Sequence, residues 1–154
     1  MSRLKSRRRA DYLYFLSYRT RWSDNDQYSH VNNSTYNLWF DSIVNTYLIE
    51  CCSLDPPTSK SIGLVISSYC EFFAPLSFPQ VVDLGLRVNK LGNSSVTYEV
   101  GVFPQGGDEP SAVGGYTHVF VEREARRSTL MPSQVREGLS KLFLEEPRSS
   151  SAKL

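Results

Sequence analysis

The sequence has 154 residues, with 17 Lys and Arg against 16 Asp and Glu and a formal net charge of +1. This length suits one domain, and a hydrophobic content of 40% is enough to fill a single core. The balanced charge excludes a global field that would attract nucleic acid or an anionic membrane, so an anionic ligand would need a local site. The longest apolar stretches, such as residues 62–66, fall far short of the roughly 20 residues of a membrane helix, so a soluble protein is expected.

Cysteine usage and the basic first residues bear on location. Cys51, Cys52 and Cys70 cannot all be bridged within one chain, which favours a reducing compartment and buried or half-buried thiols. The opening MSRLKSRRRA carries five basic groups and no acid, and it resembles the front of a transit peptide. A strand-like run begins almost at once, so we interpret residues 1–12 as a solvated basic tail. The expected location is cytoplasmic, and a mitochondrial one is the alternative.

The first half of the chain predicts a strand and a long helix. Residues 14–22 are rich in aromatic and β-favouring side chains, which is typical of a strand, and residues 23–27 form a polar loop. Apolar residues then recur at spacings of three and four over residues 33–51, which predicts an amphipathic helix about 28 Å long. Three good N-cap residues precede this face, namely Asn32, Asn33 and Ser34. Ser53 and the Asp-Pro-Pro sequence at residues 55–57 mark its end, because proline does not continue a helix.

The second half predicts an antiparallel sheet. Four strand candidates are separated by Gly- and Pro-containing turns and lie at residues 62–73, 80–91, 95–103 and 112–122. No helix is expected between them, which favours antiparallel over parallel pairing. A short helix is expected over 133–144, followed by a flexible tail over 145–154. Residues 13–144 are thus expected to form one α+β domain, with the long helix packed against the sheet.

The connection into the long helix holds the candidate chemistry. Asp24, Asp26 and His30 lie within a few residues of the capping asparagines. A helix amino terminus offers free N–H groups and a partial positive charge, so it stabilises an anion formed beside it. For acyl transfer, this combination would supply a base or nucleophile together with donors for the oxyanion. By spacing alone, an acidic loop before a helix is more often a turn and capping device than a catalytic one.

A family resemblance favours catalysis. The string D-N-D-Q-Y-S-H-V-N-N, with Tyr36 and Phe40-Asp41 after it, resembles the signature of the 4-hydroxybenzoyl-CoA thioesterase family of hotdog proteins. Similarity continues through residues 67–76, 88–95 and 119–132, and covers about residues 14–142. The resemblance implies a hotdog fold, in which an antiparallel sheet wraps around one long central helix, and hydrolysis of an acyl thioester such as an acyl-CoA.

The resemblance also implies roles for individual residues. Asp26 would be catalytic, either as the nucleophile or as the general base that activates water, and the backbone N–H of Asn33 would stabilise the oxyanion. His30 is a further catalytic candidate that would orient a water or the acid, but it could instead bond a backbone carbonyl or the next subunit. For Asp24 we favour a turn acceptor over a like charge that would raise the pKa of Asp26.

Substrate-binding candidates lie in three places. Tyr36 would line an acyl pocket together with Trp39, Phe72 and Phe73. Ser67 and Ser68 lie where the third strand could face the thioester, although an ordinary structural role is the alternative for both. Lys90, Ser94 and Ser95 belong to the hairpin where family members place CoA phosphates. Two departures weaken the match, because Ser29 replaces the usual glycine and the hairpin has Lys90 alone as a basic group. CoA and acyl carrier protein therefore both remain open as carriers.

The resemblance implies a homodimer with a continuous sheet, or a homotetramer, with active sites at the subunit boundary. The sequence predicts no metal site, no cofactor and no nucleic-acid partner. A hotdog hydratase or dehydratase is an alternative, although the H-V-N-N run is unlike its motif. A non-catalytic acyl-binding module is the other alternative, against which the presence of Asp26 counts.

Overall fold

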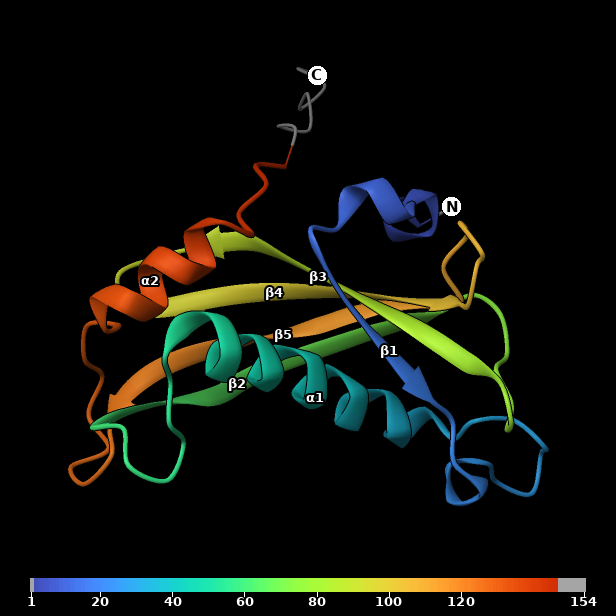
Figure 1. The fold of residues 1–154 in the computed structure, drawn as a ribbon, viewed down its shortest axis with the longest axis horizontal. Helices are drawn as coiled ribbons and strands as arrows, with labels where there is room; N and C mark the ends of the chain where they lie inside the picture. Colours follow the sequence, from blue (N-terminus) through green and yellow to red (C-terminus); the bar gives the residue numbers. More distant parts are fainter. Residues whose placement is uncertain (1, 147–154) are drawn as a thin grey trace, which may run out of the picture.

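Five antiparallel strands form one curved sheet that wraps around a long helix in the computed structural model, which describes residues 2–146 (Figure 1). The strand order across the sheet is β1-β3-β4-β5-β2. The strands are β1 (Tyr14–Arg19), β2 (Ser61–Phe72), β3 (Val81–Leu91), β4 (Ser95–Pro104) and β5 (Ala112–Glu122), and the helices are α1 (Asn33–Cys52) and α2 (Ser133–Ser140). The predicted α+β hotdog arrangement of sheet and central helix is confirmed.

Two element ends differ by several residues from those expected, and the other ends agree to within one residue. The first strand was expected to reach residue 22, but β1 ends at Arg19. Residues Trp22–Asp24 instead form a 3-10 turn, because the Asp24 carboxylate accepts the Arg21 backbone N–H at 2.7 Å and closes that turn. The second helix was expected to reach residue 144, but α2 ends at Ser140.

The helix α1 is held by its apolar face. Nine of its residues are buried, including Tyr36, Trp39, Phe40, Ile43 and Val44, and they pack into the core of the sheet's concave side. At the carboxyl end, Ser53 takes a left-handed conformation with φ of 57° and ends the helix. Because the sheet encloses this face along its length, the amino terminus of α1 has a fixed position.

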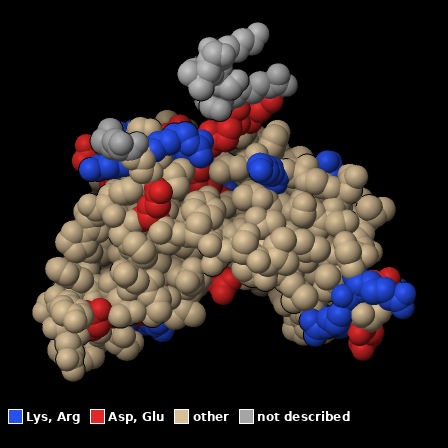
Figure 2. Space-filling model, turned by 180° about the vertical axis from the view of Figure 1, so that it is seen from behind, with Lys and Arg blue, Asp and Glu red and all other residues tan. Residues whose placement is uncertain are grey.

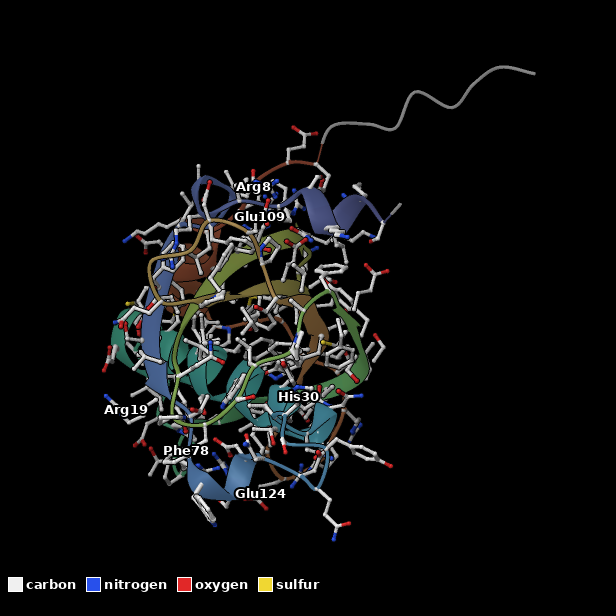
Figure 3. The ribbon with its side chains drawn as sticks, turned by 90° about the vertical axis from the view of Figure 1, so that its right-hand side faces the viewer. Arg8, Arg19, His30, Phe78, Glu109 and Glu124 are labelled. Atoms are coloured by element: carbon white, nitrogen blue, oxygen red, sulfur yellow. The ribbon has the colours of Figure 1, made fainter. Side chains whose placement is uncertain are left out.

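The opposite face of the sheet is covered by the chain's first residues, which form the turns η1 (Arg3–Ser6) and η2 (Arg9–Asp11) (Figures 1 and 3). Leu4 is buried there, and the Tyr12 ring lies over two glycines of adjacent strands. A Cβ at Gly101 would lie 2.6 Å from the Tyr12 ring, so only glycine allows this approach. The basic segment therefore packs on the sheet, unlike the solvated tail expected from its composition.

Beneath this segment lies a buried carboxylate. Glu99 of β4 is fully buried and accepts hydrogen bonds from Arg7 at 2.8 and 2.9 Å, from the Tyr12 hydroxyl at 2.7 Å and from Asn89 at 2.9 Å. Burial alone would raise the pKa of Glu99, but these donors outweigh it and hold the pKa below its usual range. The ion pair thus ties the amino-terminal segment to the sheet.

The remaining expectations for the chain concern its thiols and its end. Cys52 is buried and Cys70 half-buried as expected, whereas Cys51 is exposed, which corrects that part of the prediction. The expected tail begins at residue 145, and all but its first two residues lie outside the described part of the chain. No helix in the described part has the length and apolar character needed to cross a membrane.

Replacing Arg7 tests the amino-terminal contact. We expect Arg7→Ala to lower the free energy of unfolding by about 3 kcal/mol, because it leaves the Glu99 charge buried without its charged partner. Denaturant unfolding would measure the change, with Lys5→Ala, an exposed side chain of the same segment, as the control. Equal stability of the two variants would mean that the Arg7 contact does not hold the segment on the sheet.

Candidate active site

The loop between β1 and α1 folds back on itself in a tight turn. The Asp26 N–H donates to the His30 carbonyl at 3.0 Å, and Asn25 pairs with Val31 in an isolated bridge. Ser29 lies at the tip with φ of 65°, in the left-handed region that glycine adopts without cost. The departure from the family's glycine is therefore accommodated by a serine in the glycine conformation, at a cost of about 1–2 kcal/mol.

Asp24 shapes the loop and does not face Asp26 as a free charge. Its carboxylate is buried and accepts from both the Arg21 backbone and the Arg21 guanidinium, at 2.7 and 3.1 Å. Its carbonyl accepts the Asn32 N–H at 2.9 Å, which joins the start of the loop to the start of the helix. The turn-acceptor interpretation of Asp24 is confirmed.

Asp26 lies half-buried beside the first turn of α1. One carboxylate oxygen accepts the Tyr28 N–H at 2.8 Å, and the other accepts the side-chain amide of Asn32 at 3.0 Å. Asn32 is itself the N-cap of α1, and its amide oxygen accepts the Ser34 N–H at 3.0 Å. The carboxylate thus lies within one side chain's reach of the helix start.

The first backbone N–H of α1, that of Asn33, is a free donor within residues 2–146. The carbonyl of Asn32 accepts the Thr35 N–H at 2.9 Å, and the Ser34 N–H is capped as described. The N–H of Asn33 has no acceptor within residues 2–146. A free donor at the positive end of a helix is suited to binding an oxyanion.

Two hollows flank this loop. One of about 310 Å³ lies between the start of α1 and the end of β2, and its walls are His30, Val31, Asn33, Tyr36, Phe72, Phe73, Ala74 and Pro75. The other, of about 430 Å³, is lined by Trp22, Asn25, Asp26, Gln27 and Ser29. Within one chain, Asp26 and Asn33 therefore line neighbouring hollows, and Asn32 lies between them in sequence. Figure 3 shows His30 at this end of the molecule, on the side where β2 forms the edge.

The predicted acyl-pocket residues are divided by the structure. Tyr36, Phe72 and Phe73 line the first hollow, whereas Trp39 is buried in the core against the rings of Tyr18 and Tyr36. The side chain of Trp39 is thus part of the packing that holds α1.

The predicted Ser67 lies on the other face of β2. It pairs with Thr117, which alternates with the core residues Tyr116 and His118, so the Ser67 side chain points away from α1. The neighbouring Ser68 lines a further hollow of about 240 Å³ beside α1, together with Asn37, Phe40, Asp41, Val65 and Tyr116. The Tyr116 hydroxyl is buried with no hydrogen-bond partner within residues 2–146. Burial and the charge of Asp41 both raise the pKa of Tyr116.

The sequence indicated Ser68 and, through the family resemblance, Asp41, but it gave no signal for Asn37 and Tyr116 in the lining of this hollow. Asn37 and Asp41 stand four and eight residues after Asn33, so they lie along the same side of α1. Pairing them with Ser68 and Tyr116 required the sheet register, which no local pattern reveals.

The predicted phosphate-binding residues lie far from the helix start. β3 begins next to the loop between β1 and α1, where the Phe78 N–H donates to the Asn25 side chain at 3.0 Å, and it ends at the hairpin that carries Lys90, Ser94 and Ser95. Eleven extended residues span roughly 35 Å, so one chain does not bring these residues to Asp26. Arg87 is buried and donates to carbonyls of Asp11 and Leu144, so its charge does not face the hollows around Asp26.

The second histidine of the chain, His118 on β5, has a structural role. It is buried, and its Nδ1 lies 3.3 Å from the Tyr98 hydroxyl. Burial lowers the pKa of His118 to about 4, because the charged form is poorly solvated inside the core.

The pKa of His118 makes stability depend on pH. The unfolded chain binds this proton below about pH 6.5, whereas the folded chain binds it only below about pH 4, so stability falls as the pH drops between them. We expect a loss on the order of 3 kcal/mol over this window, measured as unfolding free energy against pH. His118→Phe should remove much of this slope, and an unchanged slope would contradict the assignment.

Known proteins resemble this chain in sequence and in fold. A family model described as "Thioesterase-like superfamily" matches residues 20–139. The crystal structure of the PA5185 protein of Pseudomonas aeruginosa is 50% identical, with a TM-score of 0.88 over 89% of this chain and 96% of that one.

Two more distant structures share the fold and have named activities. Slr0204 of Synechocystis, a 1,4-dihydroxy-2-naphthoyl-CoA thioesterase, is 12% identical, with a TM-score of 0.76 over 84% of this chain and 96% of its own. The gentisyl-coenzyme A thioesterase BH1999 is 22% identical, with a TM-score of 0.72 over 82% of this chain and 99% of its own.

Proposed function

The chain belongs to the thioesterase-like superfamily, and on that premise we propose that it hydrolyses acyl thioesters at the start of α1, with Asp26 as its catalytic carboxylate. The observation that carries the proposal is the free Asn33 N–H next to a carboxylate held at the same helix terminus. Acyl transfer needs a group that attacks the carbonyl or activates water, and a donor for the oxyanion that results. Asp26 would supply the first and Asn33 the second.

The aromatic wall of the hollow of about 310 Å³ supports an acyl substrate. The walls of this hollow include the rings of Tyr36 and Phe72, which pack edge to face at a centroid distance of 5.0 Å. Such a surface would accept the acyl group, with the carbonyl at the helix start and the sulfur directed outward. Acyl-CoA is the proposed carrier, since two proteins with the same fold are named for CoA thioesters. Membership of the 4-hydroxybenzoyl-CoA thioesterase family within this superfamily is part of the same proposal.

Asp26→Asn tests the chemistry. We expect kcat for thiol release to fall by at least about two decades across a panel of acyl-CoAs, because the amide neither attacks the carbonyl nor accepts a proton from water. Glu124→Gln, an exposed carboxylate at the far end of the sheet, is the matched control and should leave kcat unchanged. Full activity of Asp26→Asn would remove the proposed mechanism. Loss of an enoyl-CoA without thiol release would favour the hydratase alternative, and ligand binding without turnover would favour the binding-module alternative.

A homodimer is the proposed active unit. β2 is an edge strand of twelve residues whose outer side has no partner strand among residues 2–146, and its middle is exposed and apolar at Leu64, Val65 and Ile66. Figure 2 shows the molecule from this side, where the central surface carries few charges while Lys and Arg gather along the top and at one lower end. A long apolar edge is a strong site for strand pairing, and a second copy of β2 would complete it.

Pairing would bring further groups to each site. A dimer built on β2 sets a partner surface beside the hollow that contains Phe72 and the one that contains Asp41. It would also let the hairpin with Lys90, Ser94 and Ser95 act in a site other than that of its own chain. In such a dimer, the hairpin of one copy would serve the loop of the other, although the hairpin and the loop lie at opposite ends of one chain.

Ile66→Lys tests the dimer. Ile66 is 64% exposed in the single chain, and a charge there would be buried on pairing, so we expect the variant to be monomeric with thioesterase activity reduced at least tenfold. Sedimentation velocity and the thiol-release assay measure the two effects. Leu130→Lys, an exposed apolar residue outside β2, is the control. An unaltered assembly in Ile66→Lys would contradict pairing through this edge.

A further inference from the structure

We propose that Asn32 is a positioning residue, whose side-chain amide bridges the first turn of α1 to the Asp26 carboxylate and holds that carboxylate in line with the oxyanion donor. This inference rests on the proposed function, because it assigns a second partner to the same catalytic carboxylate. The contacts that carry it are the two ends of one amide: oxygen to Ser34 N–H at 3.0 Å, and nitrogen to Asp26 at 3.0 Å.

The orientation of the amide follows from its surroundings. The backbone N–H of Ser34 is a donor at the helix start, so it must be met by the amide oxygen. The Ser34 hydroxyl also lies 2.6 Å from that oxygen. The amide nitrogen is then left facing Asp26, whose ionised carboxylate accepts but cannot donate. Flipping the amide would place two acceptors together and would leave the helix donor unmet, so both bonds select the same orientation.

Among residues 2–146, the Asn32 amide is the side-chain group that joins the Asp26 carboxylate to the first turn of α1. The other Asp26 oxygen is held by the Tyr28 N–H, which belongs to the same turn and moves with it. Ser29, at the tip of that turn, is in a left-handed conformation, and Tyr28 is 84% exposed. Backbone hydrogen bonds tie the loop to the helix start, and the Asn32 amide extends that fixed position to the carboxylate itself.

A capping asparagine is normally replaceable. Serine and aspartate cap helices about as well as asparagine, so a residue that served only as a cap would tolerate either one. Neither replacement can donate a hydrogen bond to Asp26 from this position at neutral pH. Serine is too short to reach, and the carboxylate of aspartate would set a like charge against Asp26. The two substitutions therefore separate the cap from the bridge.

The test compares Asn32→Ser and Asn32→Asp in the full-length protein with acyl-CoA substrates. We expect both variants to keep a melting temperature within a few degrees of wild type, since the cap survives. We expect kcat to fall by about 10- to 100-fold, because a carboxylate displaced by about an ångström loses its line of attack. KM should change little, since the acyl hollow is untouched, and Asn32→Asp should be at least as slow as Asn32→Ser.

Asn45→Ser is the matched control on the same helix. Among the described residues, 2–146, the Asn45 amide donates only to the Asp41 carbonyl one turn back, so this substitution removes a local bond without a catalytic partner. Its kcat should equal that of wild type. Asn32 variants with wild-type kcat, or with a kcat lost only in proportion to folded protein, would overturn the bridge.

Asp26→Asn separates the two proposals. If Asp26→Asn is inactive while Asn32→Ser and Asn32→Asp are fully active, the inference fails and the proposed function stands. If Asp26→Asn retains full activity, the proposed function fails, and the bridge fails with it because there is no catalytic carboxylate to position.

Discussion

The burial of one face of α1 inside the curved sheet is the interaction on which the rest of the molecule depends. Trp39, Phe40, Ile43 and Val44 are almost wholly buried, and their removal from water supplies stability at about 25 cal/mol per Å² of apolar surface. Because this packing acts along the whole helix, the helix cannot shift or rotate without opening the core. Its free amino terminus is therefore fixed in space, which is the requirement for a preorganised oxyanion donor.

The two faces of the sheet pack against different parts of the chain. The concave face holds α1 and the hollows at its start. The convex face is covered by the amino-terminal segment, in which Arg7 and Tyr12 satisfy the buried Glu99. A carboxylate buried in this way contributes only while its donors remain in place, so the segment and the sheet depend on each other. The edge of the sheet at β2 is left open and apolar, and there the proposed second copy would bind.

The loop between β1 and α1 depends on both local and global constraints. Asp24 closes a turn with Arg21, Ser29 takes the conformation of a glycine, and Asn32 caps the helix. Each of these is a local device with a sequence signature. Their combined effect, a carboxylate next to a free backbone donor, depends on α1 being held at one angle to the loop. This is why an acidic loop before a helix is ambiguous in sequence and informative in the folded chain.

The sequence by itself determined the element order, most element boundaries and the place of the candidate site. These follow from local physics: the three- and four-residue spacing around Tyr36 and Tyr47, the cap residues at the start of α1, and turn residues between strands. Only the tertiary structure decided which faces those residues share. The bulge between Val65 and Ser67 directs Ser68 toward α1 and Ser67 away from it, and the register brings Tyr116 beside Asp41. The tertiary structure likewise decided that the basic first residues pack onto the sheet at Glu99. Such contacts join residues far apart in the chain, and their energy depends on pairing and burial that no short stretch of sequence contains.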